Sequence, residues 1–408
     1  MRVIVLGGGV IGMFSAYYLA RSGYDVTLVD KNLEGGETSV NNGGLIVPSF
    51  ATAPSIGVAD VLSAYFGLQG AVYISPSELV RNLGWLLEAR RNVQSAAKTL
   101  TEFGMTSLQL YRKFFDEESV DVDLQQGVVG LYRNGELARD AARQLNGRFV
   151  DERETQELGF SGLGGGVEFA DELSVDPTKL FRELRRKLSE LGTNMILGKE
   201  AHLKGTVPTI DSVTVNGEDL RADAYVLAAG AWTRGLCNSV GYDPPIIPAR
   251  GLVMKFETGG ERIAGRPVLL EDYGIPIVQH NRDMLRITAF FELKGFDRTF
   301  SKSRKDWLMR IVRKHLIDSA KLRLIGEGVG FRPCTPDQLP VIGKVPNFEN
   351  LVIASGHCLL GVTLAPATGQ LVESLIEGKP SPRDFDPRRF KRTRKTKEKN
   401  MQIQKENP

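Results

Sequence analysis

The chain has 408 residues, which predicts two or three domains at roughly 100–200 residues each. Apolar residues make up 42% of the chain and charged residues 25%, values typical of a globular protein that needs neither disulfides nor metals to fold. A net charge of +3 does not indicate a nucleic-acid-binding protein. The four histidines do not have the spacing of metal ligands.

Three cysteines, Cys237, Cys334 and Cys358, are far apart and form no CxxC pattern. This sparse, odd set is typical of a reducing compartment, so we expect a cytoplasmic protein. The N-terminus runs directly into an apolar strand, which favours a structural segment over a signal peptide. No apolar run reaches about 18 residues, and no membrane-spanning helix is expected.

The chain opens with a β-α-β pattern. Residues 3–6 are predicted to form a buried strand, residues 10–22 a helix that ends at Gly23, and residues 26–29 a second buried strand. Parallel strands need such a crossover, so the pattern predicts a parallel sheet. The following residues, 35–57, are rich in Gly, Asn, Ser and Pro and are predicted to form a loop.

Further along, residues 78–116 and 177–191 are predicted to be helical, the second with Pro177 in its first turn and Gly192 after its end. The alternation of residues 250–292 predicts an antiparallel sheet with a hairpin between 275–280 and 284–292. Short strands are expected at 224–228 and 351–354, a helix at 364–377, and a disordered tail at 388–408.

Residues 7–12 satisfy the dinucleotide motif GxGxxG. Gly7 permits the tight turn, Gly9 allows close approach to a pyrophosphate, and Gly12 lets the helix pack on the strand. The helix N-terminus offers unpaired N–H groups to the phosphates. Asp30 ends the second strand, where its carboxylate suits a ribose diol. This motif alone does not separate NAD from FAD.

Three further motifs narrow the choice. They are GFRPCTPD at 330–337, GHCLLGVTLAPATG at 356–369 and TSVNNGG at 38–44. In addition, ADAYVLAAGAW at 222–232 matches a second flavoprotein segment. Together with the glycine motif, and in their order along the chain, these motifs resemble the D-amino-acid oxidase superfamily of FAD enzymes, over about residues 1–380. Similar members are the D-amino-acid dehydrogenase small subunit, glycine oxidase and archaeal dye-linked proline dehydrogenases.

The resemblance implies an α/β fold with an α+β second domain: a Rossmann-type FAD-binding domain and a substrate domain built on an antiparallel sheet. We assign residues 1–90, 150–240 and 325–380 to the FAD-binding domain. Residues 91–149 and 241–324 form the predicted substrate domain, and residues 381–408 the basic tail.

FAD contacts are implied along the whole chain: Gly7, Gly9, Val10, Ile11, Gly12, Asp30, Lys31, Ser39, Asn42, Gly44, Leu45, Ala201, Gly230, Gly356, His357, Gly361, Val362 and Thr363. The glycines at 356 and 361 allow backbone to approach a flat ring, and the helix after Thr363 directs its N-terminal N–H groups toward it. Relatives that bind flavin covalently do so through a cysteine where this chain has Gly330, so noncovalent FAD is expected.

Arg332 is the predicted substrate residue, because the superfamily binds the substrate carboxylate with the matching arginine and a guanidinium pairs with a carboxylate through two hydrogen bonds. Tyr273 either donates to the same carboxylate or packs in the core. Arg286 and His357 are interpreted as structural residues rather than as substrate or proton-transfer groups.

The resemblance implies oxidation of the C–N bond of a small amino acid, a D-amino acid or proline, with a dye- or quinone-type electron acceptor. An oxygen-using oxidase and a non-catalytic electron-transfer subunit stay open as alternatives, as do a homo-oligomer or a partner subunit. Residues 61–75 are apolar and residues 388–399 carry eight Lys/Arg and one Glu. Both could support peripheral contact with the inner face of the cell membrane.

Overall fold

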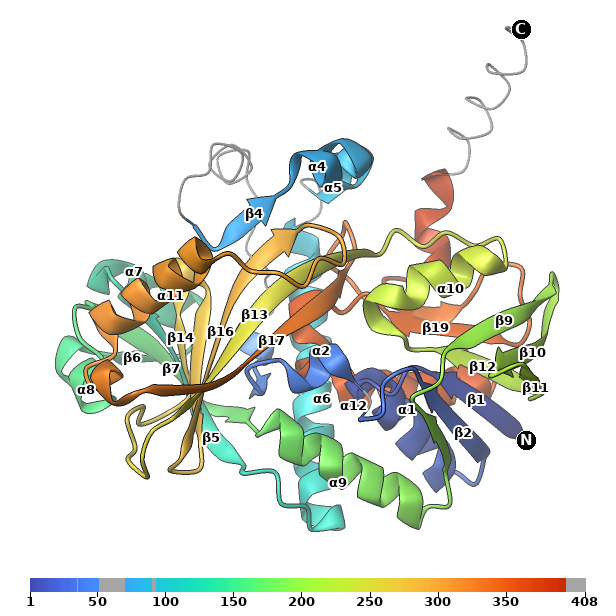
Figure 1. Ribbon diagram of the computed structural model, residues 1–408, viewed down its shortest axis with the longest axis horizontal. Coiled ribbons are helices and arrows are strands. Elements are labelled where there is room, and N and C mark those ends of the chain that lie inside the picture. The colour runs from blue at the N-terminus through green and yellow to red at the C-terminus, as the bar shows by residue number, and fades with distance from the viewer. Residues whose placement is uncertain (35, 51–69, 90–92, 394–408) are drawn as a thin grey trace, which may run out of the picture.

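A computed structural model describes residues 1–34, 36–50, 70–89 and 93–393 of the chain. Figure 1 shows two parts side by side, each built around one sheet: a mixed α/β part that contains the N-terminus and a part dominated by long antiparallel strands. This arrangement confirms the predicted fold class.

The first sheet has six strands in the order β18-β19-β12-β1-β2-β8. Their bounds are β1 Arg2–Leu6, β2 Asp25–Asp30, β8 Asn194–Leu197, β12 Ala224–Leu227, β18 Val341–Lys344 and β19 Leu351–Ser355. Neighbouring strands are parallel, except that β18 is antiparallel to β19. The predicted strands at 3–6, 26–29, 224–228 and 351–354 are all present, and the β-α-β prediction is confirmed.

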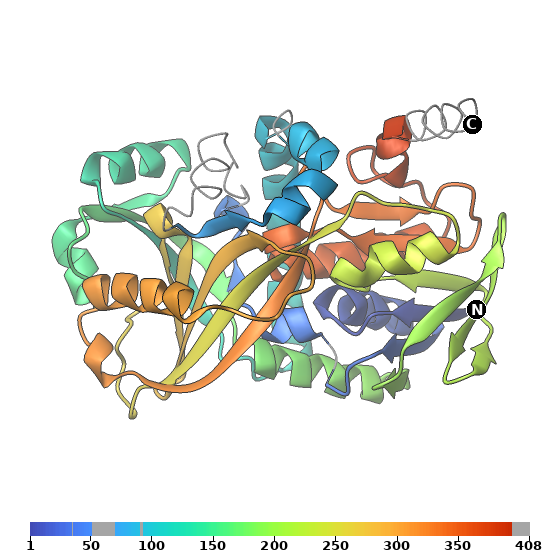
Figure 2. The same cartoon turned by 45° about the horizontal axis from the view of Figure 1, so that its top comes forward.

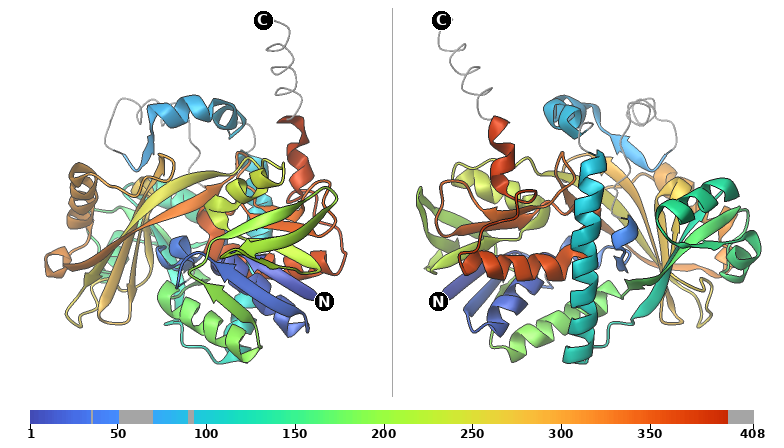
Figure 3. Two further views of the ribbon diagram at one scale, coloured as in Figure 1. Left: turned by 45° about the vertical axis from the view of Figure 1, so that its right-hand side comes forward. Right: turned by 180° about the vertical axis from the view of Figure 1, so that it is seen from behind.

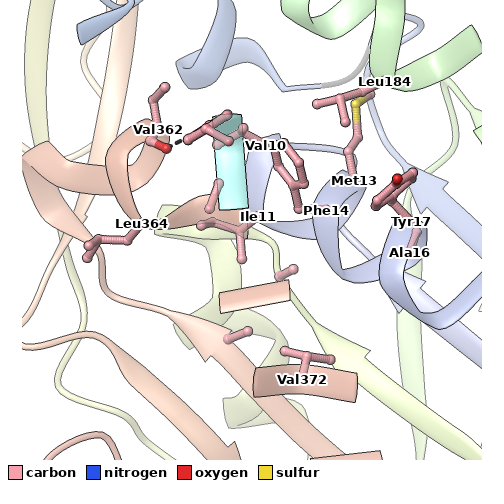
Figure 4. Packing of buried hydrophobic residues seen from close by; sticks show 14 of the residues in the cluster. Val10, Ile11, Met13, Phe14, Ala16, Tyr17, Leu184, Val362, Leu364 and Val372 are labelled. Carbon is pink, nitrogen blue, oxygen red and sulfur yellow. Dashed lines mark hydrogen bonds between the residues drawn. The ribbon is translucent and has the colours of Figure 1, made fainter. Parts of the chain in front are cut away.

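Helices α1 (Val10–Arg21), α6 (Val93–Glu118) and α12 (Gly361–Ile376) pack together in the core beside this sheet, with α9 (Pro177–Glu190) against α1. Figure 3 shows α6 crossing α12 from behind, and Figure 4 shows side chains of α1 and α12 in one cluster. Phe14 makes edge-on contacts with Tyr111 and Phe114, both at 5.3 Å between ring centroids. Gly369 of α12 is required here, since a Cβ would lie 2.7 Å from the Phe14 backbone.

The second sheet has ten strands, eight of them in the order β17-β13-β16-β15-β14-β5-β7-β3, with β4 paired to β16 and β6 to β7. Their bounds are β3 Leu45–Ile46, β4 Val72–Ile74, β5 Gln125–Tyr132, β6 Arg148–Val150, β7 Gly165–Ser174, β13 Ile247–Glu257, β14 Val268–Leu270, β15 Ile275–His280, β16 Met284–Leu293 and β17 Arg323–Cys334. The predicted hairpin is confirmed as β15 and β16.

A small sheet of β9 (Ala201–Thr206), β10 (Thr209–Val215) and β11 (Glu218–Leu220) adjoins the first sheet, with α10 (Thr233–Ser239) nearby. Figure 2 shows α10 over this part and α11 (Lys302–His315) along the outside of the ten-stranded sheet. The remaining helices are α2 Glu37–Val40, α4 Pro76–Arg81, α5 Leu83–Ala89, α7 Gly135–Gln144 and α8 Glu152–Glu157. Short 3-10 turns are η1 Pro48–Phe50, η2 Gly230–Trp232, η3 Glu271–Tyr273, η4 Ser319–Lys321, η5 Cys358–Leu360 and η6 Pro387–Thr393.

Several predicted domain assignments differ from the structure. Helix α6 was expected in the substrate domain, yet its apolar face belongs to the core around α1 and α12. Strands β3, β4, β7 and β17 were expected in the FAD-binding domain, yet all four belong to the ten-stranded sheet. In each case the chain crosses between the two parts, and only tertiary packing decides which side a segment joins.

Smaller differences occur at loops and ends. The predicted loop contains α2, β3 and η1, while its residues 51–57 lie outside the described residues. Helix α12 begins at Gly361, three residues before its predicted start. The tail is ordered farther than expected, because Arg389 forms an ion pair with Asp337 at 2.7 Å.

By length and composition alone, one helix in the described part, Cys358–Ile376, could cross a membrane. Of its most apolar window, 61% is buried inside the protein, where the helix packs against α1 and α6. These contacts identify a core helix rather than a spanning one. Within the apolar segment 61–75, Val72–Ile74 form strand β4 and residues 61–69 lie outside the described part.

Candidate active site

A cavity of about 1460 Å³ lies between the two sheets and is lined by both. Ligand pockets for drug-sized molecules measure roughly 300–1,000 Å³, so this cavity has room for a large ligand together with a small one. One end is formed by the turn after β1, the end of β2 and the α2 segment. The other is formed by β13, β14, β16 and β17 of the ten-stranded sheet.

The turn between β1 and α1 is built by glycines that no other residue could replace. Gly7 has φ +112°, and a Cβ there would collide with the backbone of Ala228 and Ala229. A Cβ on Gly12 would collide with the Gly7 carbonyl, so Gly12 lets α1 start against β1 and does not itself line the cavity. Gly9, Val10 and Ile11 form the cavity wall at the N-terminus of α1, where the partial positive charge of the helix end favours an anion.

Asp30 lies at the end of β2 with its carboxylate fixed by two backbone donors. The N–H of Gly8 donates to Oδ2 at 2.6 Å and the N–H of Asn32 donates to Oδ1 at 2.7 Å. Lys31 follows, with Nζ 3.7 Å from the centroid of the Trp232 ring. Burial lowers the Lys31 pKa. Asp30 and Lys31 both line the cavity.

The segment after α2 is held by its own side chains. Asn42 accepts a hydrogen bond from the N–H of Gly44 at 2.6 Å and donates to the Ser39 carbonyl. Ser39 Oγ accepts from the N–H of Val10 at 3.1 Å, which joins this segment to α1. Leu45, Ala201 and Gly230 complete this end of the lining.

The loop after β19 closes the cavity from the side of α12. His357, Gly361 and Val362 line it, whereas Gly356 and Thr363 do not. Gly356 has φ +86° and a Cβ would lie 2.7 Å from Thr335, so packing explains this glycine. Thr363 Oγ1 instead accepts from the N–H of Val47 at 3.2 Å, which ties α12 to the chain after β3.

His357 is buried, and its Nε2 lies 2.9 Å from Thr368 Oγ1. Burial lowers the His357 pKa to about 3, so the ring stays neutral at physiological pH. This position agrees with its interpretation as a packing residue.

Cys334 and Cys358 form a disulfide, with 4.4 Å between their Cα atoms. The spacing of the cysteines in the sequence did not indicate this pairing. Twenty-four residues separate the two cysteines in the sequence, but the fold brings the end of β17 beside the loop after β19. Cys334 lies two residues after Arg332, so the disulfide ties the arginine's strand to the loop at 356–362.

Arg332 lines the cavity from β17 without an acidic partner among the described residues. Its Nη1 donates to the carbonyl of Phe290 at 2.7 Å, and the guanidinium covers Gly251 of β13, where a Cβ would overlap it. Burial lowers the Arg332 pKa to about 10, which leaves the group charged at neutral pH. A charged, enclosed group with most of its donors unused is a strong attractor for an anionic ligand.

Phe290 owes its position to an irregularity in β16. The register between β13 and β16 shifts between the pairs Arg250–Glu292 and Leu252–Ala289, and Phe290 takes φ +72° at this bulge. Bulges redirect groups beside active sites, and this one directs the Phe290 carbonyl at Arg332. The Phe290 ring stacks on Phe300 at 5.5 Å between centroids.

Tyr273 lines the cavity, but its hydroxyl lies 3.2 Å from His315 Nε2. His315 Nδ1 faces the Ser161 carbonyl at 2.9 Å, which assigns the ring proton to Nδ1. Tyr273 therefore donates to Nε2. Its proton is engaged, so the tyrosine does not offer it to a substrate carboxylate in this arrangement.

Arg286 is a structural residue, as expected. It is 1% exposed and donates to the Val40 carbonyl at 2.9 Å and to Thr178 Oγ1 at 2.7 Å. Asp176 lies 3.3 Å from its Nη2. These contacts join the hairpin to α9. Arg286 does not line the cavity, whereas Arg332 does.

Two groups at this end of the cavity were missed from the sequence: Gly251 and Glu271. Gly251 stands in an ordinary strand pattern, and Glu271 follows a short strand and looks like a solvent-facing turn residue. Phe290 lies on a predicted strand that could line the pocket, but its sequence favours a core residue; in the structure it lines the cavity and adopts a left-handed conformation that is rare for aromatic residues. None of the three carries a motif that could have identified it.

The sequence and the fold were compared with known proteins. The model of the family described as "DAO: FAD dependent oxidoreductase" matches residues 2–375. A D-amino acid dehydrogenase of Vibrio vulnificus is 28% identical over 93% of this chain and 97% of its own length.

Among solved structures, glycine oxidase from Geobacillus kaustophilus superposes with a TM-score of 0.76 at 22% identity, covering 94% of this chain and 98% of its own. L-Proline dehydrogenase from P. horikoshii gives a TM-score of 0.75 at 19% identity, covering 96% and 98%. The shared fold therefore extends over nearly the whole chain.

The disulfide gives the first prediction. Closing a loop of this length stabilises a protein by about 3 kcal/mol. We expect the Cys334→Ser/Cys358→Ser variant to unfold at a lower temperature than the unreduced protein and to retain flavin less firmly, because β17 and the loop at 356–362 lose their link. Thermal unfolding followed by flavin fluorescence measures both effects.

Reductant should lower the melting temperature of the wild-type protein and leave that of the double-serine variant unchanged, which is the matched control. Thiol labelling of the denatured protein should find one thiol, Cys237, before reduction and three after it. Three thiols without reductant would show that the disulfide does not form.

Proposed function

This chain belongs to the DAO family of FAD-dependent oxidoreductases, and from that premise we propose that it is an amino-acid dehydrogenase. In this proposal it oxidises the α C–N bond of a D-amino acid or proline to the imine and passes the electrons to a dye- or quinone-type acceptor. The observation that carries the proposal is Arg332, a charged and unpaired guanidinium at the substrate end of the cavity.

The residues present fit FAD. Gly9 of the turn at 7–12 presents main chain without a side chain to the cavity, where a pyrophosphate would approach closely, and the anchored carboxylate of Asp30 suits a ribose diol. The loop at 356–362 presents Gly361, where a Cβ would meet no atom within 4 Å, toward the space for a flat ring. No cysteine stands at position 330, which supports noncovalent binding.

Bound FAD supplies the hydride acceptor of the reaction. The protein's part is to position the substrate: Arg332 binds the carboxylate through two parallel hydrogen bonds and so fixes the Cα–H direction. The neighbouring apolar walls, which include Phe290 and Trp307, exclude water and favour a neutral amine. Substrate without a carboxylate would lack this orientation.

The D-amino acid dehydrogenase of Vibrio vulnificus and the L-proline dehydrogenase of P. horikoshii support a dehydrogenase in this proposal. Glycine oxidase supports the alternative in which oxygen is the acceptor. An electron-transfer subunit without its own substrate is the other alternative, and the unpaired Arg332 argues against it, since such a subunit needs no carboxylate site.

The variant Arg332→Ala tests whether Arg332 binds the substrate carboxylate. Loss of a bidentate, charge-assisted pair costs on the order of 2–4 kcal/mol, so kcat/KM should fall roughly 30- to 1000-fold, mainly through KM. Acid precipitation should release all flavin from both proteins into the supernatant. An equal amount of released flavin per protein would show that the variant still binds FAD noncovalently. A tenfold or smaller fall would assign the carboxylate to another residue.

A pair of glycine variants controls for the geometry. Gly251→Ala places a methyl group against the Arg332 guanidinium and should raise KM. Gly326→Ala on β17 meets no atom within 4 Å and should not. Equal kinetics for the two alanine variants would contradict the position assigned to Arg332.

Substrate and acceptor are tested with a panel of D- and L-amino acids, including both prolines. We expect turnover with an artificial dye or a soluble quinone to exceed turnover in aerated buffer without dye. Equal rates without dye would make the protein an oxidase. Flavin content without turnover of any amino acid would favour the electron-transfer subunit.

We further propose peripheral contact with an anionic membrane surface, where a quinone acceptor would be met. Helices α4 and α5 support it, since Val80 is 80% exposed and Leu83 and Leu87 are each 54% exposed. These helices lie on the same side of the molecule as η6, from which the chain continues into its basic tail (Figures 1 and 3).

The membrane proposal predicts flotation with vesicles that contain anionic lipid at low salt. Removal of residues 394–408 should weaken flotation, since each Lys/Arg near such a surface contributes roughly 1 kcal/mol, and Leu83→Ser/Leu87→Ser should weaken it further. Vesicles of neutral lipid are the control. If the full-length protein stays at the bottom of the gradient, the membrane contact is wrong.

A further inference from the structure

Glu271 places a second charged group in the same cavity as Arg332. It follows β14 as the first residue of η3 and lines the cavity. Its carboxylate lies over Gly130 of β5 and close to Phe50: a Cβ on Gly130 would come 2.8 Å from Glu271 Oε1 and 3.1 Å from the Phe50 ring. The side chain therefore turns inward against the sheet.

The Glu271 carboxylate has no partner of its own in the described part of the chain. Its Oε1 is enclosed and makes no hydrogen bond there, and no ion pair involves the residue. Burial and, to a lesser extent, the neighbouring Asp272 raise the Glu271 pKa to about 7. Asp272 differs, because it is exposed and accepts a hydrogen bond from the N–H of Arg133 at 2.7 Å.

An enclosed carboxylate without a partner is costly to ionise, and a cation brought beside it would recover that cost. The described residues provide no such cation at Glu271. Arg332, in the same cavity, is a cation without an acidic partner among these residues. A single ligand with a carboxylate for Arg332 and a cation for Glu271 would pair with both groups.

The spacing of the strands sets the size of that ligand. The Arg332 guanidinium reaches the Phe290 carbonyl on β16, and Glu271 extends from the end of β14. Because the Glu271 carboxylate lies over Gly130 of β5, the order β16-β15-β14-β5 separates the two charged groups by three steps of about 4.8 Å each, roughly 14 Å in all. An extended amino acid with a three- or four-carbon side chain, with its α-carboxylate at one end, a cation at the other and a hydrogen bond of about 2.8 Å at each end, spans this separation.

We propose that Glu271 selects amino acids with a cationic side-chain end, such as lysine, ornithine or arginine, by pairing with that cation while Arg332 binds the α-carboxylate. The inference rests on the proposed function, because it names the substrate class of the same site. The aromatic walls, which include Tyr132 and Trp307, would cover the methylene groups between the two charges.

Paired substrates of nearly equal shape test the proposal in the holoenzyme. Arginine is compared with citrulline, and lysine with norleucine, each as the enantiomer that the amino-acid panel identifies. A hydrogen-bonded charge pair should favour the cationic member by roughly 10- to 100-fold in kcat/KM. Equal values within each pair would overturn the proposal.

Glu271→Gln keeps the shape of the side chain and removes its charge. It should abolish the preference by raising KM for arginine and lysine, so that kcat/KM becomes nearly equal within each pair. Glu172→Gln is the matched control: burial also raises the Glu172 pKa to about 7, but this residue accepts from the N–H of Ser49 at 2.6 Å and does not line the cavity. A preference that persists in Glu271→Gln would overturn the proposal.

A binding measurement separates this inference from the proposed reaction. 6-Aminohexanoate and hexanoate carry the carboxylate but no α-amino group, so they bind without turnover. Calorimetric titration should show that the wild type binds 6-aminohexanoate roughly 10-fold or more tightly than hexanoate. The Glu271→Gln variant should bind the two acids with equal affinity. Absence of turnover with every amino acid would refute the proposed function, whereas equal affinity of the two acids would refute the role of Glu271.

Discussion

The site depends on keeping an arginine charged inside the protein without giving it an acid. An enclosed guanidinium usually finds a carboxylate, and Arg250 in this chain does so, pairing with Glu292 at 2.6 Å. Arg332 has instead one backbone carbonyl at 2.7 Å, supplied by the bulge at Phe290, and a surface cleared by Gly251. These features hold the guanidinium in place and leave its other donors for a ligand.

That arrangement also explains why the cavity lies between two sheets. The first sheet supplies the glycine turn and the anchored Asp30, which suit a dinucleotide, and the ten-stranded sheet supplies Arg332 and Glu271. Strand β17 carries Arg332 from the second sheet back toward the first, and the Cys334–Cys358 disulfide fixes it there. In the proposed function, the cofactor and the substrate therefore meet at one strand end.

Much of this could be predicted from the sequence, for identifiable reasons. The glycines at 7, 9 and 12 and the acid at 30 follow from local rules of backbone geometry, and the hairpin of β15 and β16 follows from alternation along the chain. The position of α6 could not be predicted, since an amphipathic helix does not specify which core it joins. The same holds for the disulfide, whose cysteines meet through tertiary structure, and for Glu271, which becomes a cavity residue only because η3 turns inward.

The most direct test of the account is a crystal structure of the holoenzyme with a carboxylic acid that it cannot oxidise, such as 6-aminohexanoate. The account predicts both carboxylate oxygens at roughly 2.7–2.9 Å from two nitrogens of Arg332, with the Phe290 carbonyl still bound to Nη1. A carboxylate bound elsewhere in the cavity, with Arg332 held only by Phe290, would contradict it.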